Sequence, residues 1–246
     1  TGSGAIRKLG RVDHKDAFLD TDTLEKARGI TIFSKQALLT AGNTDITLLD
    51  TPGHVDFSTE TERTLQVLDY AVLVVSGTDG VQSHTETLWR LLRRYHVPTF
   101  VFVNKMDLPG KSREELLAQL NHRLGEGFVA FDVPQADRDE ALALCDENLM
   151  DRMLDAGQLT DADIIPAVAR RHVFPCWFGS ALRRTENDAL ESVDALLDGI
   201  DRYTRPAPAL DAFGAKVFKV SQDEQGTRLT WLRVTGGELK VKAQLS

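Results

Sequence analysis

Residues 99–107 read Thr-Phe-Val-Phe-Val-Asn-Lys-Met-Asp, an apolar run that passes directly into polar side chains. A short, nearly continuous apolar run is typical of a strand buried on both faces, as in a mainly parallel sheet. Runs of the same character lie at residues 46–49, 71–75 and 173–178. Helical patterns separate them, at residues 57–68, 85–95 and 112–124. Strand and helix in alternation predict an α/β fold with a doubly wound parallel sheet.

A turn signal precedes the first parallel strand. Gly42-Asn43 lies between two short β patterns at residues 35–40 and 45–49. Two such patterns joined by a two-residue turn predict a hairpin. We therefore expect an antiparallel strand ahead of the parallel ones.

The amino-acid composition is that of a globular protein with one large domain or two ordinary ones. The chain has 246 residues, of which 42% are hydrophobic. It contains no stretch close to the roughly 20 apolar residues that a membrane span needs. Its two cysteines, Cys145 and Cys176, cannot form a disulfide framework, so a reducing cytosol is the expected compartment.

The net charge of −8 argues against a protein that binds nucleic acid through bulk charge. The acidity is uneven, however. Residues 108–212 hold 11 basic and 20 acidic side chains, whereas residues 213–246 hold 6 basic and 3 acidic ones. An acidic total therefore does not exclude a partner that contains nucleic acid.

Proline content and periodicity predict the domain organisation. Two prolines indicate a linker over residues 206–214. We expect an α/β domain over residues 1–205, with an acidic helical insertion at about 125–165. Alternating apolar residues after the linker predict the first strands of an antiparallel β-barrel domain over residues 215–246.

Three polar segments follow strands, where ligands bind in open α/β sheets. Asp50-Thr-Pro-Gly-His54 follows the first run; its aspartate suits a magnesium ion and Gly53 lets a backbone amide approach a phosphate. The alternative is a tight strand-to-helix turn.

Asn104-Lys105-Met106-Asp107 suits recognition of guanine. Asp107 can accept hydrogen bonds from the N1 and N2 donors of that base, Asn104 can contact the base edge, and the stem of Lys105 can pack along the ring. Taken alone, this tetrapeptide is equally compatible with a polar turn. The small residues of Gly179-Ser180-Ala181-Leu182 would let backbone amides reach the carbonyl oxygen of the same base.

A fourth segment, Arg28-Gly-Ile-Thr31-Ile, lies upstream in a polar region. Such a segment can become ordered around a γ-phosphate and magnesium, with the Thr31 hydroxyl as a metal ligand. The alternative is a plain entry into a strand.

Together these motifs resemble those of the translational GTPases. The four segments quoted above are similar to the G2, G3, G4 and G5 elements of that superfamily. The histidine after Asp-Thr-Pro-Gly distinguishes the chain from Ras-like GTPases. Residues 77–82 and 97–98 resemble elongation factor G and the tetracycline-resistance ribosomal protection proteins. Residues 3–6 and 9–13, with the modest length between Asp107 and Ser180, look more like the protection proteins.

The resemblance implies a fold of the P-loop NTPase type and a set of roles. His54 would be the catalytic residue that orients the attacking water, with Gly53 and Thr31 as sensors of the γ-phosphate. Thr31 and Asp50 would hold Mg²⁺ together with GTP or GDP. The implied GTP-binding residues are Asp50, Thr51, Pro52, Gly53, His54, Asn104, Lys105, Met106, Asp107, Ser180, Ala181 and Leu182.

The resemblance also implies partners. The protein is expected to act in the cytoplasm as a monomer, without a membrane, on ribosomal RNA and ribosomal proteins. Those contacts would be made mainly by domains outside this chain. Hydrolysis is expected to be slow until a ribosome positions His54.

The phosphate-binding loop of the family, Gly-x4-Gly-Lys-Ser/Thr, does not occur in the sequence. Gly110-Lys111-Ser112 imitates its end, but Lys105 stands where the first glycine belongs, and the segment follows a different strand. We expect the loop and the first strand of the domain to lie upstream of Thr1. We also expect weak or no nucleotide binding by this chain alone.

Other functions fit parts of the pattern. The nearest is translocation by an enzyme of the elongation factor G type. A degenerate GTPase that serves as a non-hydrolysing interaction module is disfavoured by the intact His54 and Thr31. A metabolic nucleotide-dependent kinase would need a catalytic acid on a lid, and the predicted β domain argues against it.

Overall fold

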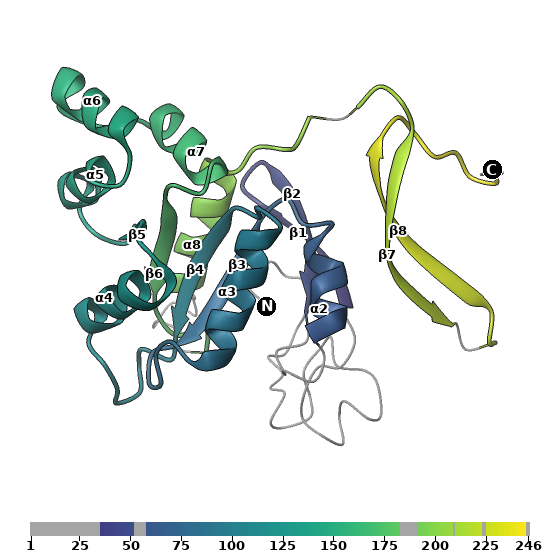
Figure 1. Cartoon of the computed structure of the whole chain (residues 1–246), viewed down its shortest axis with the longest axis horizontal. Coiled ribbons are helices and arrows are strands. Elements are labelled where there is room, and N and C mark those ends of the chain that lie inside the picture. Colours follow the sequence, from purple (N-terminus) through teal and green to yellow (C-terminus); the bar gives the residue numbers. More distant parts are fainter. Residues whose placement is uncertain (1–34, 52–57, 183–190, 209, 223–224, 245–246) are drawn as a thin grey trace. The chain divides into compact units, whose positions relative to one another are not determined.

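The computed structural model describes residues 35–51, 58–182, 191–208, 210–222 and 225–244 (Figure 1). They fall into two compact units. Of the described residues, the first unit contains 38–48, 70–182 and 191–205, and the second contains 35–37, 49–51, 58–69, 206–208, 210–222 and 225–244. In chain order, the elements are β1 (Lys35–Ala41), β2 (Thr44–Asp50), α2 (Ser58–Leu65), β3 (Ala71–Ser76), α3 (Ser83–Arg94), β4 (Thr99–Asn104), α4 (Arg113–Leu124), β5 (Phe128–Ala130), α5 (Gln135–Ala143), α6 (Glu147–Ala156), α7 (Asp161–Ala169), β6 (Phe174–Phe178), α8 (Glu191–Tyr203), β7 (Gly214–Gln222) and β8 (Arg228–Gly236).

A four-stranded sheet in the order β3-β4-β6-β5 forms the centre of the first unit. All three of its strand pairs are parallel, which confirms the predicted α/β class. Ser76 pairs with Asn104, and Val103 pairs with Phe178. The carboxyl ends of β3, β4 and β6 therefore lie side by side.

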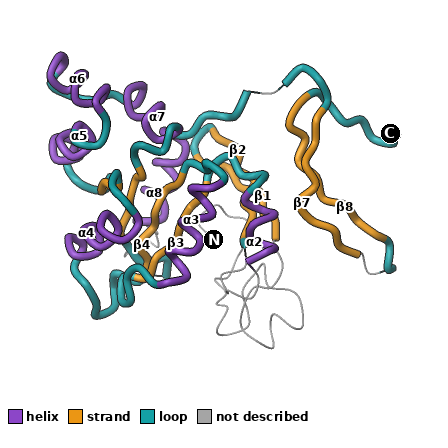
Figure 2. The backbone as a smooth tube through the Cα atoms, viewed as in Figure 1, coloured by secondary structure: helices purple, strands orange, loops and turns teal. Residues whose placement is uncertain are grey.

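Helices cover both faces of this sheet, with α3 in front and α8 behind in the views of Figures 1 and 2. On the α3 face, the Trp89 ring centroid lies 4.7 Å from that of Phe174. On the other face, Phe100 and Trp177 belong to one buried cluster with Leu196 and Tyr203 of α8. Burial of each large apolar side chain contributes about 1.5–3 kcal/mol, so this two-sided core holds the strand ends in place.

Two strands are less buried than expected. The run at 46–49 was expected to be buried in the parallel sheet, but it forms a hairpin with β1 in a separate two-stranded sheet, and Leu48 is 42% exposed. Strand β3 was also expected to be buried on both faces, yet Val74 is 58% exposed. Among the described residues β3 pairs only with β4, and its exposed residues, Val72 and Val74, lie on one face, whereas Leu73 and Val75 on the other face are buried.

The expected helices at 57–68, 85–95 and 112–124 are confirmed as α2, α3 and α4; α2 and α4 are shorter than expected, and α3 begins two residues earlier. Ser112 caps α4, because its hydroxyl accepts a hydrogen bond from the backbone nitrogen of Glu115. The acidic region after Asp107 is mostly helical, as expected. Strand β5 was missed there, because three residues are too few to show a period.

The second unit contains an antiparallel hairpin, β7–β8, which confirms the two alternating patterns after the linker. Within this unit, Arg233 Nη2 lies 2.6 Å from Asp69 Oδ1. In the part of the chain that the structure describes, no helix is long and apolar enough to cross a membrane.

Candidate functional site

Three loops meet at the carboxyl ends of the central strands. They follow β3 at residues 77–82, β4 at 105–112 and β6 at 179–182. Main-chain hydrogen bonds connect them: Gly179 N donates to Val103 O at 2.9 Å, and Met106 N donates to Gly179 O at 3.1 Å. The structure therefore brings together the segments that the sequence predicted to read a base.

Asn104 connects two of these loops through its side chain. Its Oδ1 accepts hydrogen bonds from the backbone nitrogens of Lys105, at 2.8 Å, and Ala181, at 2.9 Å. With the carbonyl oxygen engaged, the side-chain amide nitrogen keeps two N–H donors for a ligand. Asn104 therefore holds the loops after β4 and β6 together.

Lys105 has a left-handed backbone, with φ of 65°. A non-glycine residue in that region carries strain of order 1–2 kcal/mol. Hydrogen bonds on both sides stabilise it, since Lys105 N donates to Asn104 Oδ1 and Lys105 O accepts from Leu108 N at 3.1 Å. The turn leaves Lys105 and Asp107 exposed and Met106 half-buried, so a cation and a carboxylate are accessible to a ligand.

The loop after β6 is held close to α8. Ser192 Oγ donates to Ser180 O at 3.5 Å. Ala181 is half-buried and Leu182 is exposed. The backbone nitrogen of Ala181 is bonded to Asn104 Oδ1, so the predicted contact of this loop with a ligand stays a prediction.

The other predicted site residues are divided between described and undescribed parts of the chain. Asp50 is the last residue of β2, Thr51 follows it, and both are half-buried. Thr31, Pro52, Gly53 and His54 lie outside the described residues, so their predicted roles stay predictions.

The loop after β3 contributes residues to which sequence reasoning gave no role. Gly77 N donates to Asn104 O at 2.7 Å. Hydrogen bonds from the hydroxyls of Ser76 and Thr78 hold the pKa of Asp79 below its usual value. A Gly-Thr-Asp-Gly segment directly after a strand was the available signal for a structured loop at this edge.

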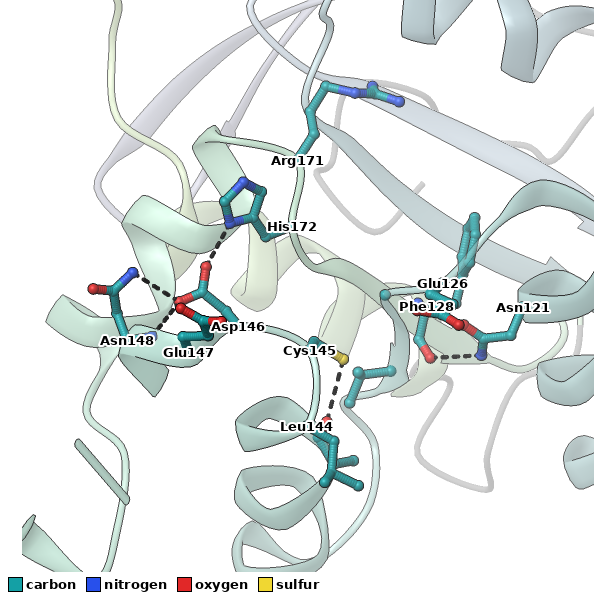
Figure 3. Close-up of a pocket in the computed structure, with 13 residues that line it drawn as sticks. Asn121, Glu126, Phe128, Leu144, Cys145, Asp146, Glu147, Asn148, Arg171 and His172 are labelled. Atoms are coloured by element: carbon teal, nitrogen blue, oxygen red, sulfur yellow. Dashed lines mark hydrogen bonds and ion pairs between the residues drawn. The ribbon is translucent and has the colours of Figure 1, made fainter. Parts of the chain in front are cut away.

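A separate cavity of about 790 Å³ lies beside the connection between α5 and α6 (Figure 3). Its polar groups bind one another, since His172 Nδ1 lies 2.5 Å from Asp146 Oδ2 and Cys145 Sγ donates to Ala141 O at 3.2 Å. Burial raises the pKa of the Cys145 thiol, which disfavours the reactive thiolate. Among the described residues no cluster of His, Cys, Asp and Glu is suited to a metal ion. The cavity therefore offers no activated nucleophile.

Comparison with known proteins gives one family match and several relatives. The model of the elongation factor Tu GTP-binding domain matches residues 1–206. Tetracycline resistance protein TetM of Streptomyces lividans is 35% identical, over 99% of this chain and 41% of the relative. The oxytetracycline resistance protein of Streptomyces rimosus is 37% identical, over 96% of this chain and 39% of the relative.

Elongation factor G of Mycoplasma genitalium is 32% identical, over 97% of this chain and 44% of the relative. A crystal structure from Thermus thermophilus matches with a TM-score of 0.81 and 26% identity, covering 97% of this chain and 42% of that one. The chain thus spans about two fifths of the length of these proteins.

Proposed function

Because the chain belongs to the translational GTPases that carry an elongation factor Tu GTP-binding domain, we propose that the protein binds GTP and hydrolyses it to GDP and phosphate on the ribosome. We propose further that it is of the ribosomal protection type, which confers resistance to tetracycline. Support comes from the 35% and 37% identity to resistance proteins, against 32% and 30% to two elongation factors G.

The observation that carries the proposal is the hydrogen bond from Ala181 N to Asn104 Oδ1. It joins the loop of the Asn-Lys-Met-Asp motif to the loop after β6, so both can contact one base. Asp107 would accept the N1 and N2 hydrogens of guanine, and adenine lacks that donor pair. The exposed Asp107 is accessible for this role.

Hydrolysis would depend on residues near the end of β2. We propose that His54 orients the water that attacks the γ-phosphate, and that Gly53 and Thr31 contact that phosphate. The donor set fits magnesium, since Asp50 and Thr31 both offer oxygen atoms, which Mg²⁺ prefers. When bound, the ion would neutralise charge on the phosphate oxygens.

We propose the following organisation for the protein. Residues 1–205 form the GTP-binding domain with an insertion at about 125–165, residues 206–214 link it to the next domain, and residues 215–246 begin a β-barrel. The protein would work as a cytoplasmic monomer on the ribosome. The 246 residues lack the Gly-x4-Gly-Lys-Ser/Thr loop, so tests of binding should use a longer form that includes such a loop.

The first test exchanges one side chain and one base. Asp107→Asn replaces a carboxylate oxygen by an amide nitrogen, which repels the N2 amine of guanine and donates to the C2 carbonyl of xanthine. We expect GDP affinity to fall by about 100-fold or more and XDP affinity to rise, as for a site whose polar groups are matched to one partner. Titration calorimetry measures both, with Asp194→Asn on α8 as the control. Equal GDP binding by the Asp107 variant would refute base recognition at this loop.

The second test separates the two types of activity. The protein is added with GTP to ribosomes that hold labelled tetracycline, and to ribosomes that await translocation. Release of the drug without translocation is the expected result. Translocation without release would instead identify an enzyme of the elongation factor G type, and binding without ribosome-stimulated hydrolysis would identify an interaction module.

A further inference from the structure

The Gly110-Lys111-Ser112 segment, which imitates a phosphate-binding loop, is engaged in other contacts. Ser112 caps α4, and its hydroxyl accepts from Glu115 N at 3.2 Å. Lys111 Nζ donates to the main-chain oxygen of Asp79 at 2.9 Å. The segment therefore binds the loop that follows β3.

Gly110 brings two backbones into contact. A Cβ atom at this position would lie 2.8 Å from Thr78 Cα and 2.9 Å from Gly77 O. Backbone atoms cannot move away as the end of a flexible side chain can. The φ angle of Gly110 lies outside the left-handed region, so the close approach, and not the conformation, requires glycine here.

Hydrogen bonds within the loop after β3 hold its shape, so contacts on one side of the loop can fix the residues on its other side. Gly80 N donates to Ser76 O at 2.7 Å, and Ser76 Oγ donates to Asp79 Oδ2 at 2.8 Å. Helix α4 holds the following residue, since Val81 N donates to Gln119 Oε1 at 3.1 Å. The loop is thus fixed at two separated points, by Lys111 just before α4 and by Gln119 within it.

The other side of this loop contacts the Asn-Lys-Met-Asp motif. Gly77 N donates to Asn104 O at 2.7 Å. A Cβ at Gly77 would lie 2.6 Å from Met106 Sδ, so this side chain lies directly against the loop. A continuous series of contacts therefore runs from Lys111 through the loop to Asn104 and Met106.

We propose that Gly110 and Lys111 are positioning residues for the recognition of guanine. They hold the loop of residues 76–80 against Asn104 and Met106, and this fixes the main chain that carries Asp107. The proposal rests on the proposed GTP-binding function for its ligand. The claim that Gly110 and Lys111 hold the loop in place rests only on the contacts described above.

The first measurement needs no nucleotide and uses this chain. Lys111→Met keeps the aliphatic stem and removes the donor, Lys111→Arg restores a donor, and Arg90→Met removes an exposed cation on α3. Hydrogen exchange is followed at the amides of Gly77 and Ala181. We expect about threefold to tenfold faster exchange in Lys111→Met, the range for loss of one hydrogen bond. The Lys111→Arg and Arg90→Met variants should match the parent chain, and unchanged exchange in Lys111→Met would overturn the proposal.

The second measurement uses the longer, nucleotide-binding form and compares GDP with IDP. Hypoxanthine, the base of IDP, lacks the N2 amine of guanine. The affinity for GDP divided by the affinity for IDP therefore reports how well Asp107 is placed. Gly110→Ala and Lys111→Met should lower this ratio about threefold to tenfold, and Lys111→Arg should restore it. A general loss of protein stability would lower the affinities for GDP and IDP alike and leave their ratio unchanged. An unchanged ratio with accelerated exchange would overturn the positioning role, whereas a parent protein without preference for GDP would overturn the proposed function itself.

Discussion

Gly179 is a residue whose identity is dictated by one neighbour. A Cβ at this position would lie 2.1 Å from Ser192 Cβ and 2.2 Å from its Oγ. The next nearest atom, Ser192 Cα, would be 3.6 Å away, which is an ordinary contact. The first turn of α8 therefore sets how closely the loop after β6 can pack.

Gly179→Ala should accordingly destabilise the protein by about 1–3 kcal/mol, as overpacking does. Adding Ser192→Gly removes both clashing atoms and should recover most of that loss. Urea unfolding of the parent, the two single variants and the double variant gives the coupling. A double variant no more stable than Gly179→Ala would show that Ser192 is not the cause.

The order of the motifs along the chain led us to expect a base-binding loop at Asn-Lys-Met-Asp, but the sequence did not predict the hydrogen bonds that hold this loop. The bond from Ala181 N to Asn104 Oδ1 joins residues 77 positions apart, and no local pattern encodes such a distance. The predicted reason for small residues at 179–182 was access of backbone to a ligand, and the contact with Ser192 adds packing as a second reason.

Among the elements, α6 depends most clearly on a charge at its start. Asp146 Oδ1 accepts from Asn148 N at 2.9 Å and from Leu149 N at 3.3 Å, and Oδ2 contacts His172 (Figure 3). Burial opposes ionisation of this carboxyl, but the hydrogen bonds from His172, Asn148 and Leu149 outweigh it and lower its pKa. The helix cap is therefore stronger when Asp146 is charged.

A carboxyl whose pKa is lowered by folding stabilises the folded state fully at pH values above the pKa of the unfolded state, which is about 3.9 for Asp. This stabilisation is lost as the pH falls through the lower pKa of the folded state. Asp146→Asn keeps a side-chain oxygen for the cap but removes the charge, so it should cost about 0.5–1 kcal/mol at pH 7 and progressively less as the pH falls through the lowered pKa of the folded carboxyl. Urea unfolding between about pH 2.5 and 7 measures this, with the exposed Asp155→Asn as control. A cost that does not change with pH would contradict the electrostatic origin.

Strand burial was the element property that sequence predicted least well. Apolar runs correctly located β2 and β3, but the same runs implied burial on both faces. Burial depends on the neighbours of a strand: β4 lies between β3 and β6 and is buried along Thr99–Val103, whereas β3 has one partner among the described strands. The run itself contains no information on its place in the sheet order.

For the molecule as a whole, the net charge does not decide between the possible partners. The net charge of −8 is concentrated in residues 108–212, in which helices α5 and α6 carry several exposed acids. Steering toward an RNA-rich particle depends on local fields within about 8–10 Å at physiological salt, not on total charge. The family match, and not the charge, is what supports a ribosomal partner.

Activity of the whole protein should depend on His54 in a way that nucleotide binding does not. An imidazole that only orients the attacking water contributes to the transition state and little to the bound ground state. His54→Ala should lower ribosome-stimulated hydrolysis by about 10²–10⁴-fold and leave GDP affinity within about twofold, with the exposed His96→Ala as the matched control. Single-turnover hydrolysis with saturating ribosomes separates this step from ribosome binding. A His54 variant that hydrolyses GTP at the parental rate would exclude the residue from catalysis. A variant whose GDP affinity falls as much as its hydrolysis rate would assign His54 to ligand binding, because only a loss confined to hydrolysis identifies a group that acts in the transition state.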